Sequence, residues 1–214
     1  MTIPSSPRLV AALRFLSGAA GWIAVAVGCL ILIGWLLGIE TLKTILPGLV
    51  AMNPATAVAF ILAGASLRLL DRAGPLSRAL AVAVALIGLI KLAGILFGFD
   101  LGIDQLLFRD KLGAVGDAVR PNRMAPTTAT NFLLLGLALL LADARTRPAQ
   151  FLALLIASVA ALAFVGYLYG VQSLTGVAAY IPMALHTALT FLVLSTGLLC
   201  ARPERGMMAR LSGV

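Results

Sequence analysis

The chain has few charged residues, one histidine and two cysteines, and each shortage narrows what it can be. Only 11% of its 214 residues are Asp, Glu, Lys or Arg, whereas about a quarter is usual in a soluble domain. A water-soluble fold cannot bury the 61% that are hydrophobic, so the composition predicts an integral membrane protein. Cys29 and Cys200 are expected at different depths in the membrane, which argues against a disulfide between them.

The patterns that usually mark catalytic or metal centres are also missing. The sequence has no phosphate-binding glycine loop, no zinc spacing of Cys and His, no nucleophile elbow and no paired carboxylates within an apolar segment. A three-repeat carrier is disfavoured because its Pro-x-acidic-x-x-basic signature is absent. We therefore expect neither an enzyme nor a bound cofactor or metal. No basic stretch is interleaved with aromatic residues, which argues against a nucleic-acid partner.

Six apolar segments are long enough to be considered as membrane spans. A spanning helix needs about 20 mostly apolar residues, and these continuous runs lack the alternation of a membrane barrel. The second and fourth segments are short, so we expect them to extend into the interface. The sequence therefore predicts an all-α membrane protein with six transmembrane helices. The segments cover residues 15–37, 54–70, 78–97, 126–141, 151–170 and 183–200.

Basic residues gather on one side of the predicted membrane. The side that holds both termini carries ten of them, and the opposite side carries five. Because Lys and Arg accumulate in cytoplasmic connections, both termini are predicted to be cytoplasmic, with the lipid bilayer and its anionic head groups as partners. The ten are Arg8, Arg14, Arg68, Arg72, Arg78, Arg145, Arg147, Arg202, Arg205 and Arg210, and the five are Lys43, Arg109, Lys111, Arg120 and Arg123.

Two short phrases occur three times each along the chain. The first reads Gly34-Trp-Leu-Leu-Gly38 and returns at residues 94–98 and 166–170. The second begins with a methionine and ends with a phenylalanine, at residues 52–60, 124–132 and 183–191. Self-similarity of this kind predicts a repeat architecture. We interpret the chain as one membrane domain, 1–214, with helix-hairpin repeats at about 15–72, 78–143 and 149–202.

Each predicted repeat crosses the membrane twice, so all three have the same orientation. Parallel repeats of this kind are related by an axis along the membrane normal, and the expected fold is a six-helix bundle with pseudo-three-fold symmetry. The paired glycines of the first phrase are predicted to let neighbouring helices approach closely.

The second repeat carries an insertion at residues 99–123 between its two phrases. Four of the chain's eight acidic residues lie in it, and they include Asp100 and Asp104. Insertions on one face of a repeat protein are often where binding occurs. The alternative is a solvated loop whose charges cancel one another.

The methionine phrase predicts where the second helix of each repeat begins. Asn53 is a good N-cap, and Pro54 suits a first helical position; Pro126 and Pro182 have the same expected role. Three helix N-termini would then point at one outer region. One turn into each helix stands a threonine that could bind a carboxylate, a quinone carbonyl or a phosphate: Thr56, Thr128 and Thr187. Alternatively, the phrase only fixes helix starts and packs the core.

Lys91 breaks the repeat pattern, because its counterparts Ile31 and Ala163 are apolar. An ionisable residue inside a membrane span is costly and is a candidate functional residue. We expect it to pair with Asp100 or Asp104, with anion or carbonyl binding as the second possibility.

His186 and Asn131 also stand where the other repeats have smaller residues. His186 is a candidate proton sensor, or one axial ligand of a haem with Met124 or Met183 opposite. Asn131 could bond between helices or touch a ligand. The sequence-based ligand site therefore comprises Lys91, Asp100, Asp104, Thr56, Thr128, Asn131, His186 and Thr187.

Four stretches carry a resemblance to a known group of proteins: residues 98–108, 124–129, 183–188 and 201–206. They resemble the N-terminal six-helix membrane region of bacterial sensor proteins. In those proteins the region precedes cytoplasmic PAS, histidine-kinase or diguanylate-cyclase (GGDEF) domains. The resemblance implies a sensory input module in the bacterial inner membrane, as in two-component systems.

The expected function is therefore signal input. A ligand or membrane state detected at the outer face would shift the bundle, and the sixth helix would pass the shift through residues 202–210 to a cytoplasmic effector. Two alternatives stay open: an accessory structural subunit that packs on neighbouring membrane subunits, and a quinone- or haem-binding membrane protein. The expected ligand is small and anionic or quinone-like.

Overall fold

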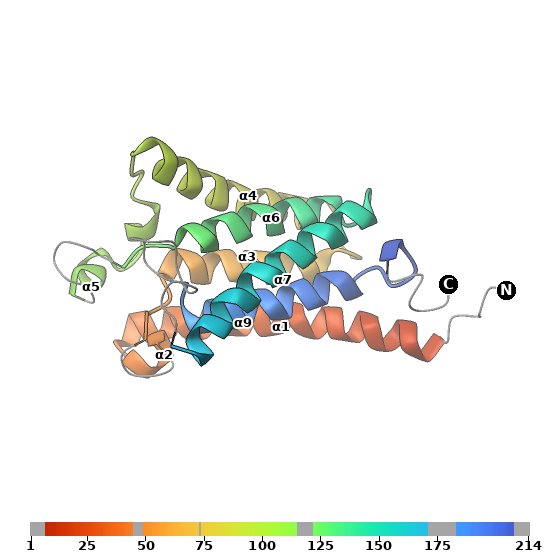
Figure 1. Ribbon diagram of the computed structural model, residues 1–214, viewed down its shortest axis with the longest axis horizontal. Helices are drawn as coiled ribbons and strands as arrows, with labels where there is room; N and C mark the ends of the chain where they lie inside the picture. Colours follow the sequence, from red (N-terminus) through yellow and green to blue (C-terminus); the bar gives the residue numbers. More distant parts are fainter. Residues whose placement is uncertain (1–6, 45–48, 73, 115–121, 171–182, 208–214) are drawn as a thin grey trace.

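The computed structural model describes residues 7–44, 49–72, 74–114, 122–170 and 183–207, and Figure 1 shows them as a bundle of helices. These residues contain no β-strand, in agreement with the predicted all-α class. The helices are α1 (Pro7–Leu37), α2 (Glu40–Thr44), α3 (Pro54–Leu69), α4 (Gly74–Phe97), η1 (Ile103–Gln105), α5 (Arg109–Ala114), α6 (Pro126–Leu141), α7 (Thr146–Leu168) and α9 (Leu185–Cys200).

Three helices, α1, α4 and α7, are long and apolar enough to cross a membrane, which suggests a membrane protein. They begin earlier than predicted, at Pro7, Gly74 and Thr146 instead of residues 15, 78 and 151. The helices α3, α6 and α9 are apolar but have only 16 residues each. At 1.5 Å per residue, a helix of this length measures about 24 Å.

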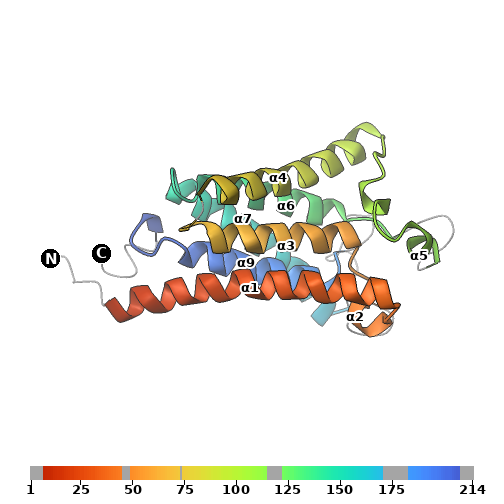
Figure 2. The ribbon, with the colours of Figure 1, turned by 180° about the vertical axis from the view of Figure 1, so that it is seen from behind.

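The helices pack in a closed order. α1 lies against α3, α4 against α6 and α7 against α9, and these pairs join through α3–α4, α6–α7 and α9–α1 (Figures 1 and 2). The short helices also contact one another at the centre. Large exposed apolar side chains lie mostly on the long helices, for example Phe15, Phe97 and Phe151. The long helices therefore form the apolar exterior.

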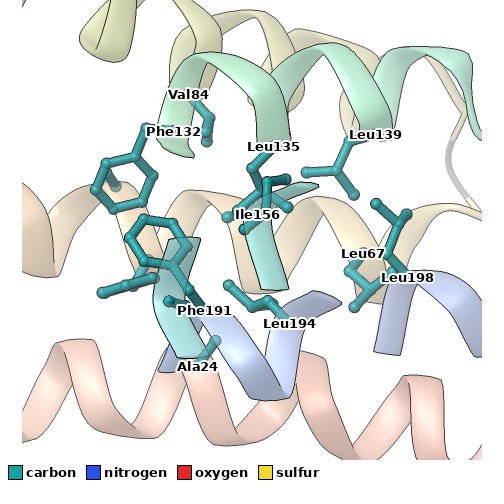
Figure 3. Packing of buried hydrophobic residues seen from close by; sticks show 14 of the residues in the cluster. Ala24, Leu67, Val84, Phe132, Leu135, Leu139, Ile156, Phe191, Leu194 and Leu198 are labelled. Atoms are coloured by element: carbon teal, nitrogen blue, oxygen red, sulfur yellow. The ribbon is translucent and has the colours of Figure 1, made fainter. Parts of the chain in front are cut away.

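Three phenylalanines meet at the centre of the bundle, one from each short helix. The ring centroids of Phe60, Phe132 and Phe191 are 4.8–4.9 Å apart in every pairing, and all three rings are fully buried. Figure 3 shows the buried side chains next to these rings, with Leu135 and Leu194 between the phenylalanines and the pair Leu139 and Leu198. The last residue of the methionine phrase is therefore a core residue in all three copies.

Small residues let the paired helices come into backbone contact. A Cβ atom on Gly28 of α1 would lie 2.6 Å from the carbonyl oxygen of Ala57, and one on Gly88 of α4 would lie 2.6 Å from that of Ala129. Such spacing leaves no room for a side chain, so any larger residue would force the two helices apart.

The glycine phrase has a different role from the one predicted. Gly38, Gly98 and Gly170 have φ angles of 74°, 72° and 65°, and a Cβ atom on any of them would meet nothing within 4 Å. A Cβ atom on Gly34, the first glycine of the phrase, would lie 2.7 Å from the Leu42 Cβ atom of α2. The prediction that the paired glycines bring helices together was therefore wrong for the three second glycines. They terminate α1, α4 and α7, because glycine adopts the left-handed conformation at a helix C-terminus without strain. At the first of them, the Ile39 N–H donates to the Gly34 carbonyl at 2.9 Å.

The helix starts agree with the prediction where they are described. The Asn53 side chain accepts a hydrogen bond from the Ala55 N–H at 2.8 Å, and Pro54 and Pro126 stand at the first helical positions. Pro182 lies outside the described residues, and α9 begins at Leu185.

Candidate functional site

The two ends of the bundle differ in the polar groups that they hold. We call the end with η1 and α5 the insertion end; α3, α6 and α9 begin there. The opposite end, where these three helices finish, is called the clamp end after the side chains of Asp71, Asp143 and Arg202, which meet there.

At the insertion end, Lys91 of α4 forms an ion pair with Asp104 of η1. Both residues are buried, with 9% and 1% of their surface exposed. The other Asp104 carboxylate oxygen accepts a hydrogen bond from the Met124 N–H at 3.3 Å. Burial raises the pKa of the Asp104 carboxyl above its usual value, and the Lys91 ammonium opposes that shift. The predicted pairing of Lys91 is confirmed, with Asp104 as its partner.

Asp100 takes a different partner. One of its oxygens lies 3.2 Å from the Arg123 guanidinium, and the other accepts a hydrogen bond from the Gly102 N–H at 2.8 Å. The bond from Gly102 is the main cause that lowers the pKa of Asp100, and the charges of Lys91 and Arg123 act in the same direction. The two predicted acidic residues thus lie in neighbouring but distinct ion pairs.

Two asparagines fasten the described part of the insertion to the start of α3. The Asn53 amide donates to the Asn122 carbonyl at 2.9 Å and to the Asp104 carbonyl at 3.4 Å. The Asn122 side-chain amide donates a hydrogen bond to the Ala51 carbonyl at 2.8 Å. Asn53 therefore caps α3 and also positions Asp104. Asn122 was not singled out from the sequence, because a lone asparagine before a basic residue gives no pattern to find.

A cavity of about 280 Å³ opens beside the Lys91 ion pair. It lies where the end of α4, the start of the insertion and the start of α6 meet. Apolar and charged groups share its wall, which includes Lys91, Ile95, Phe99, Asp100, Arg123 and Met124. A mostly apolar hollow with a few convergent polar groups is typical of a binding site for a small molecule.

The three predicted threonines converge on a second, much smaller cavity at the centre of the insertion end. Thr56, Thr128 and Thr187 all line it, together with Arg123. Its volume is about 10 Å³, which is room for about one water molecule. The sequence therefore predicted that these residues come together, and ligand binding by them stays a prediction.

Neither His186 nor Asn131 lines either of these two cavities. His186 is 5% exposed and Asn131 is fully buried. Neither ring nitrogen of His186 and neither amide atom of Asn131 has a hydrogen-bond partner among the described residues. Within that part of the chain, no group of three or more His, Cys, Asp or Glu side chains could hold a metal ion. Their predicted roles in proton sensing or ligand contact stay predictions.

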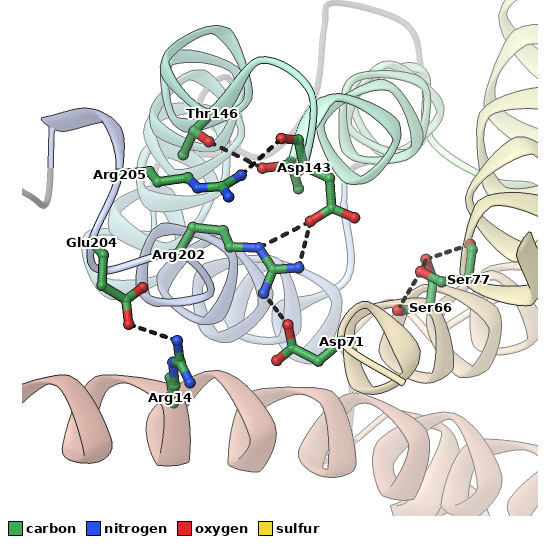
Figure 4. A network of polar contacts seen from close by, with 10 residues as sticks. Arg14, Ser66, Asp71, Ser77, Asp143, Thr146, Arg202, Glu204 and Arg205 are labelled. Atoms are coloured by element: carbon green, nitrogen blue, oxygen red, sulfur yellow. Dashed lines mark hydrogen bonds and ion pairs between the residues drawn. The ribbon is translucent and has the colours of Figure 1, made fainter. Parts of the chain in front are cut away.

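At the clamp end, one arginine joins the ends of three helices. Arg202, just after α9, forms ion pairs with Asp71, just after α3, and with Asp143, just after α6 (Figure 4). Its Nε atom also donates to Asp143 at 2.9 Å. Burial alone would lower the pKa of Arg202, but the bonds to both carboxylates outweigh it and raise that pKa.

Asp71 and Asp143 were not predicted as site residues, although the sequence holds a signal. Asp71, Asp143 and Arg202 each stand nineteen residues after the methionine of their own phrase. If the three phrases are aligned as far as the helix ends, two aspartates and one arginine occupy the same position of the repeat. Such an alignment predicts that the three side chains meet.

The segment that follows Arg202 is tied to two long helices. Glu204 pairs with Arg14 of α1 at 2.6 Å, and the Gln150 side chain of α7 accepts a hydrogen bond from the Met207 N–H at 2.6 Å (Figure 4 shows the first of these). The chain therefore leaves the bundle along a path held by α1 and α7.

No protein-family model matches this chain, and no curated protein and no solved structure matches it either.

Proposed function

We propose that the protein is a sensory input module of the bacterial inner membrane, and that it has no catalytic activity of its own. It detects a small molecule or a membrane state at its outer face and passes the change to a cytoplasmic effector. In this proposal the insertion end is the outer end, and both termini are cytoplasmic, as the distribution of Lys and Arg favours.

The proposed architecture is six transmembrane helices in three parallel hairpins around a pseudo-three-fold axis. The closed order of helix pairs supports it, since each hairpin contacts the next. The mutual contact of Phe60, Phe132 and Phe191, which end the same phrase in each repeat, supports it further.

The short helices can cross the bilayer in this proposal because the long ones surround them. A helix of about 24 Å falls short of a hydrocarbon core of about 30 Å. Irregular backbone is tolerated at membrane depth where protein covers it. The starts of α3 and α6 meet that condition, since Met52, Asn53, Met124 and Ala125 are all buried.

The observation that carries the sensory role is the buried Lys91–Asp104 pair beside an open cavity. A buried ion pair is held in balance between a large desolvation cost and its mutual attraction. A ligand in the cavity, or a proton on Asp104, changes that balance and so favours a different position of η1 on α4. Such a difference in affinity between two arrangements is what a sensor requires.

The clamp end provides the proposed output. Because Arg202 holds the ends of three helices, a shift of one hairpin against the others changes its ion pairs. In the sensor proteins that the sequence is expected to resemble, the effector domain follows the membrane region, so the proposed output lies after Arg202.

The two ends can be tested for coupling with a thiol that the chain already has. Cys200 is 5% exposed and lies at the end of α9, two residues before Arg202. In a Cys29→Ala background, N-ethylmaleimide labelling of Cys200 reports whether the clamp end opens. We expect Lys91→Met to raise the labelling rate severalfold in protein that stays folded, although the two ends lie on opposite sides of the bundle.

Ile31→Met is the matched control, because Ile31 occupies the same repeat position as Lys91 and is buried without charge. Arg202→Gln gives the labelling rate of an opened clamp. If Lys91→Met labels at the rate of the Ile31→Met control, the ends are uncoupled and the sensory proposal fails. Stoichiometric co-purification of other membrane proteins would then favour the accessory-subunit alternative.

A further inference from the structure

The second residue of the glycine phrase is aromatic in two repeats and aliphatic in one. It is Trp35 in the first repeat, Ile95 in the second and Tyr167 in the third. The Trp35 indole N–H donates to the Met52 carbonyl at 2.8 Å, and the Tyr167 hydroxyl donates to the Met183 carbonyl at 2.7 Å. In both repeats an aromatic ring thus fills the space beside the methionine that opens the second phrase and supplies its carbonyl with a donor.

The second repeat has neither the ring nor the donor. Ile95 is smaller than tryptophan or tyrosine and has no polar atom in its side chain. The Met124 carbonyl corresponds to those of Met52 and Met183, and it accepts a hydrogen bond from no described residue. Met124 is 3% exposed, so bulk water reaches it poorly.

The cavity of about 280 Å³ lies at this place. Both Ile95 and Met124 stand on its wall. The room that an aromatic side chain occupies in the first and third repeats is therefore open in the second, beside a carbonyl that lacks a donor.

We propose that this cavity binds a small aromatic molecule that carries a hydroxyl or ring N–H group. The ring takes the place of the missing aromatic side chain against Ile95 and Phe99, and its donor bonds to the Met124 carbonyl. The inference deepens the proposed function, since it names the class of ligand for the insertion end.

Size and charge favour this class. Pockets for drug-sized ligands span about 300–1,000 Å³, so a cavity at the lower limit suits one ring or two fused rings. Lys91 and Arg123 bring cationic groups to the wall, and cations are attracted to aromatic faces. The first repeat has such a contact, where the Lys43 ammonium lies 4.7 Å from the centre of the Trp35 ring.

The test uses the missing side chain itself as a probe. 4-Methylphenol is the tyrosine side chain as a free molecule, and 4-methylanisole is the same molecule with its hydroxyl hydrogen replaced by methyl. Calorimetric titration into protein in lipid nanodiscs, with empty nanodiscs as the blank, measures both affinities. We expect saturable binding of 4-methylphenol about tenfold tighter than that of 4-methylanisole, the difference that one hydrogen bond supplies. Equal affinities would overturn the proposal.

A variant can close the cavity from within. Ile95→Tyr supplies the ring and the donor together, so it is expected to abolish binding of 4-methylphenol. Leu96→Tyr, which puts the same side chain at an adjacent residue that is 70% exposed and outside the cavity wall, is expected to keep it. Binding by Ile95→Tyr at the wild-type affinity would contradict the site. In case Ile95→Tyr does not fold, photolabelling of the wild type with 4-azidophenol gives a second measurement. Labels that 4-methylphenol displaces from residues 94–99 or 123–126 support the site, and labels found only elsewhere overturn it.

The same probe separates this inference from the sensory proposal. If 4-methylphenol binds in the cavity but Lys91→Met labels Cys200 at the rate of the Ile31→Met control, the site stands and the coupling to the clamp end fails. If 4-methylphenol does not bind, but Lys91→Met still raises the labelling of Cys200, the ligand class is wrong and the coupling stands.

Discussion

The insertion end and the clamp end both hold buried or half-buried ion pairs, but they distribute them differently. Lys91 and Asp104 belong to one hairpin and its insertion, and Asp104 is almost fully buried. Arg202, Asp71 and Asp143 come from three hairpins, and the side chain of Asp71 is 60% exposed. The Lys91–Asp104 pair is therefore local and buried, whereas the ion pairs of Arg202 are shared among three helix ends and partly exposed to solvent.

This difference separates two physical roles. The stability of a buried ion pair is sensitive to any group that changes its surroundings, because its desolvation cost is large. The ion pairs of Arg202 are sensitive to movement of the helices against one another, because their geometry depends on the ends of three helices. In the proposed function, the Lys91–Asp104 pair would therefore detect a chemical change and the ion pairs of Arg202 would report a relative movement of the helices.

The largest effect on stability is expected from removing the charge of Lys91. Lys91→Met leaves the Asp104 carboxylate buried without its partner, which typically costs about 3–5 kcal/mol. Thermal or denaturant unfolding in detergent measures it, and Ile31→Met, at the same position of the first repeat, should cost far less.

The double variant Lys91→Met with Asp104→Leu tests whether the cost comes from the unpaired charge. We expect it to regain most of the lost stability, because no buried charge remains. A loss in the double variant equal to the sum of the two single losses would show that the pair is not coupled. The proposed difference between the buried Lys91–Asp104 pair and the partly exposed ion pairs of Arg202 would then be wrong.

A smaller effect is expected at the clamp end. Arg202→Gln removes charge-assisted hydrogen bonds to two carboxylates, and solvent at Asp71 weakens them, so the expected cost is about 1–2 kcal/mol. Unfolding measurements check this figure, with Arg14→Gln as a control, because Arg14 pairs with Glu204 at the same end but joins only α1 to the exit segment.

A further pair of substitutions tests whether the clamp end needs only two aspartates and one arginine, whichever helix end carries the arginine. Because Asp71 and Arg202 stand at the same position of two repeats, the exchange Asp71→Arg with Arg202→Asp keeps two acids and one base at the three helix ends. We expect the exchanged variant to be more stable than either single variant. If it is no more stable than the weaker of them, the clamp depends on its particular neighbours and not on the shared arrangement.

The next effect concerns the aromatic side chains of the insertion end. Tyr167→Phe removes the hydroxyl that donates to the buried Met183 carbonyl, and a cost of about 1 kcal/mol is expected. Tyr169→Phe is the matched control, since Tyr169 lies on the same helix end but is 78% exposed. Equal unfolding temperatures for the two variants would mean that the methionine carbonyl does not need its donor.

The sequence predicted features that local chemistry decides. Asn53 and Pro54 start a helix, because the Asn53 side chain caps the first turn and proline suits its first position. The sequence analysis did not predict that Gly38 ends a helix, although glycine tolerates the positive φ angle found there. The buried lysine predicted an acidic partner, since an unpaired charge inside the bundle is too costly.

Other features depend on geometry that the sequence pattern does not contain. The choice of Asp104 over Asp100 follows from the way Asn53 and Asn122 dock the insertion, which no repeat of the phrase predicts. The cavity depends on what surrounds Ile95, although the loss of an aromatic residue from one of three copies was visible in the aligned phrases.

The smallest expected effect separates the two acids of the insertion end by their response to pH. The pKa of Asp100 is lowered from 3.8, mainly by the Gly102 N–H, so its folded form holds a proton less tightly than its unfolded form. Asp100 therefore contributes stability that is fully present above pH 3.8 and is lost as the pH falls through the lowered pKa. We expect Asp100→Asn to lower the unfolding temperature slightly at about pH 7, and we expect this deficit to shrink as the pH falls through the lowered pKa of Asp100. Asp110→Asn, at an exposed position of α5, is the control. A deficit of constant size down to the lowest pH at which the protein stays folded would mean that Asp100 acts through its shape and not its charge. The Asp100–Arg123 ion pair would then contribute nothing to holding the insertion in place.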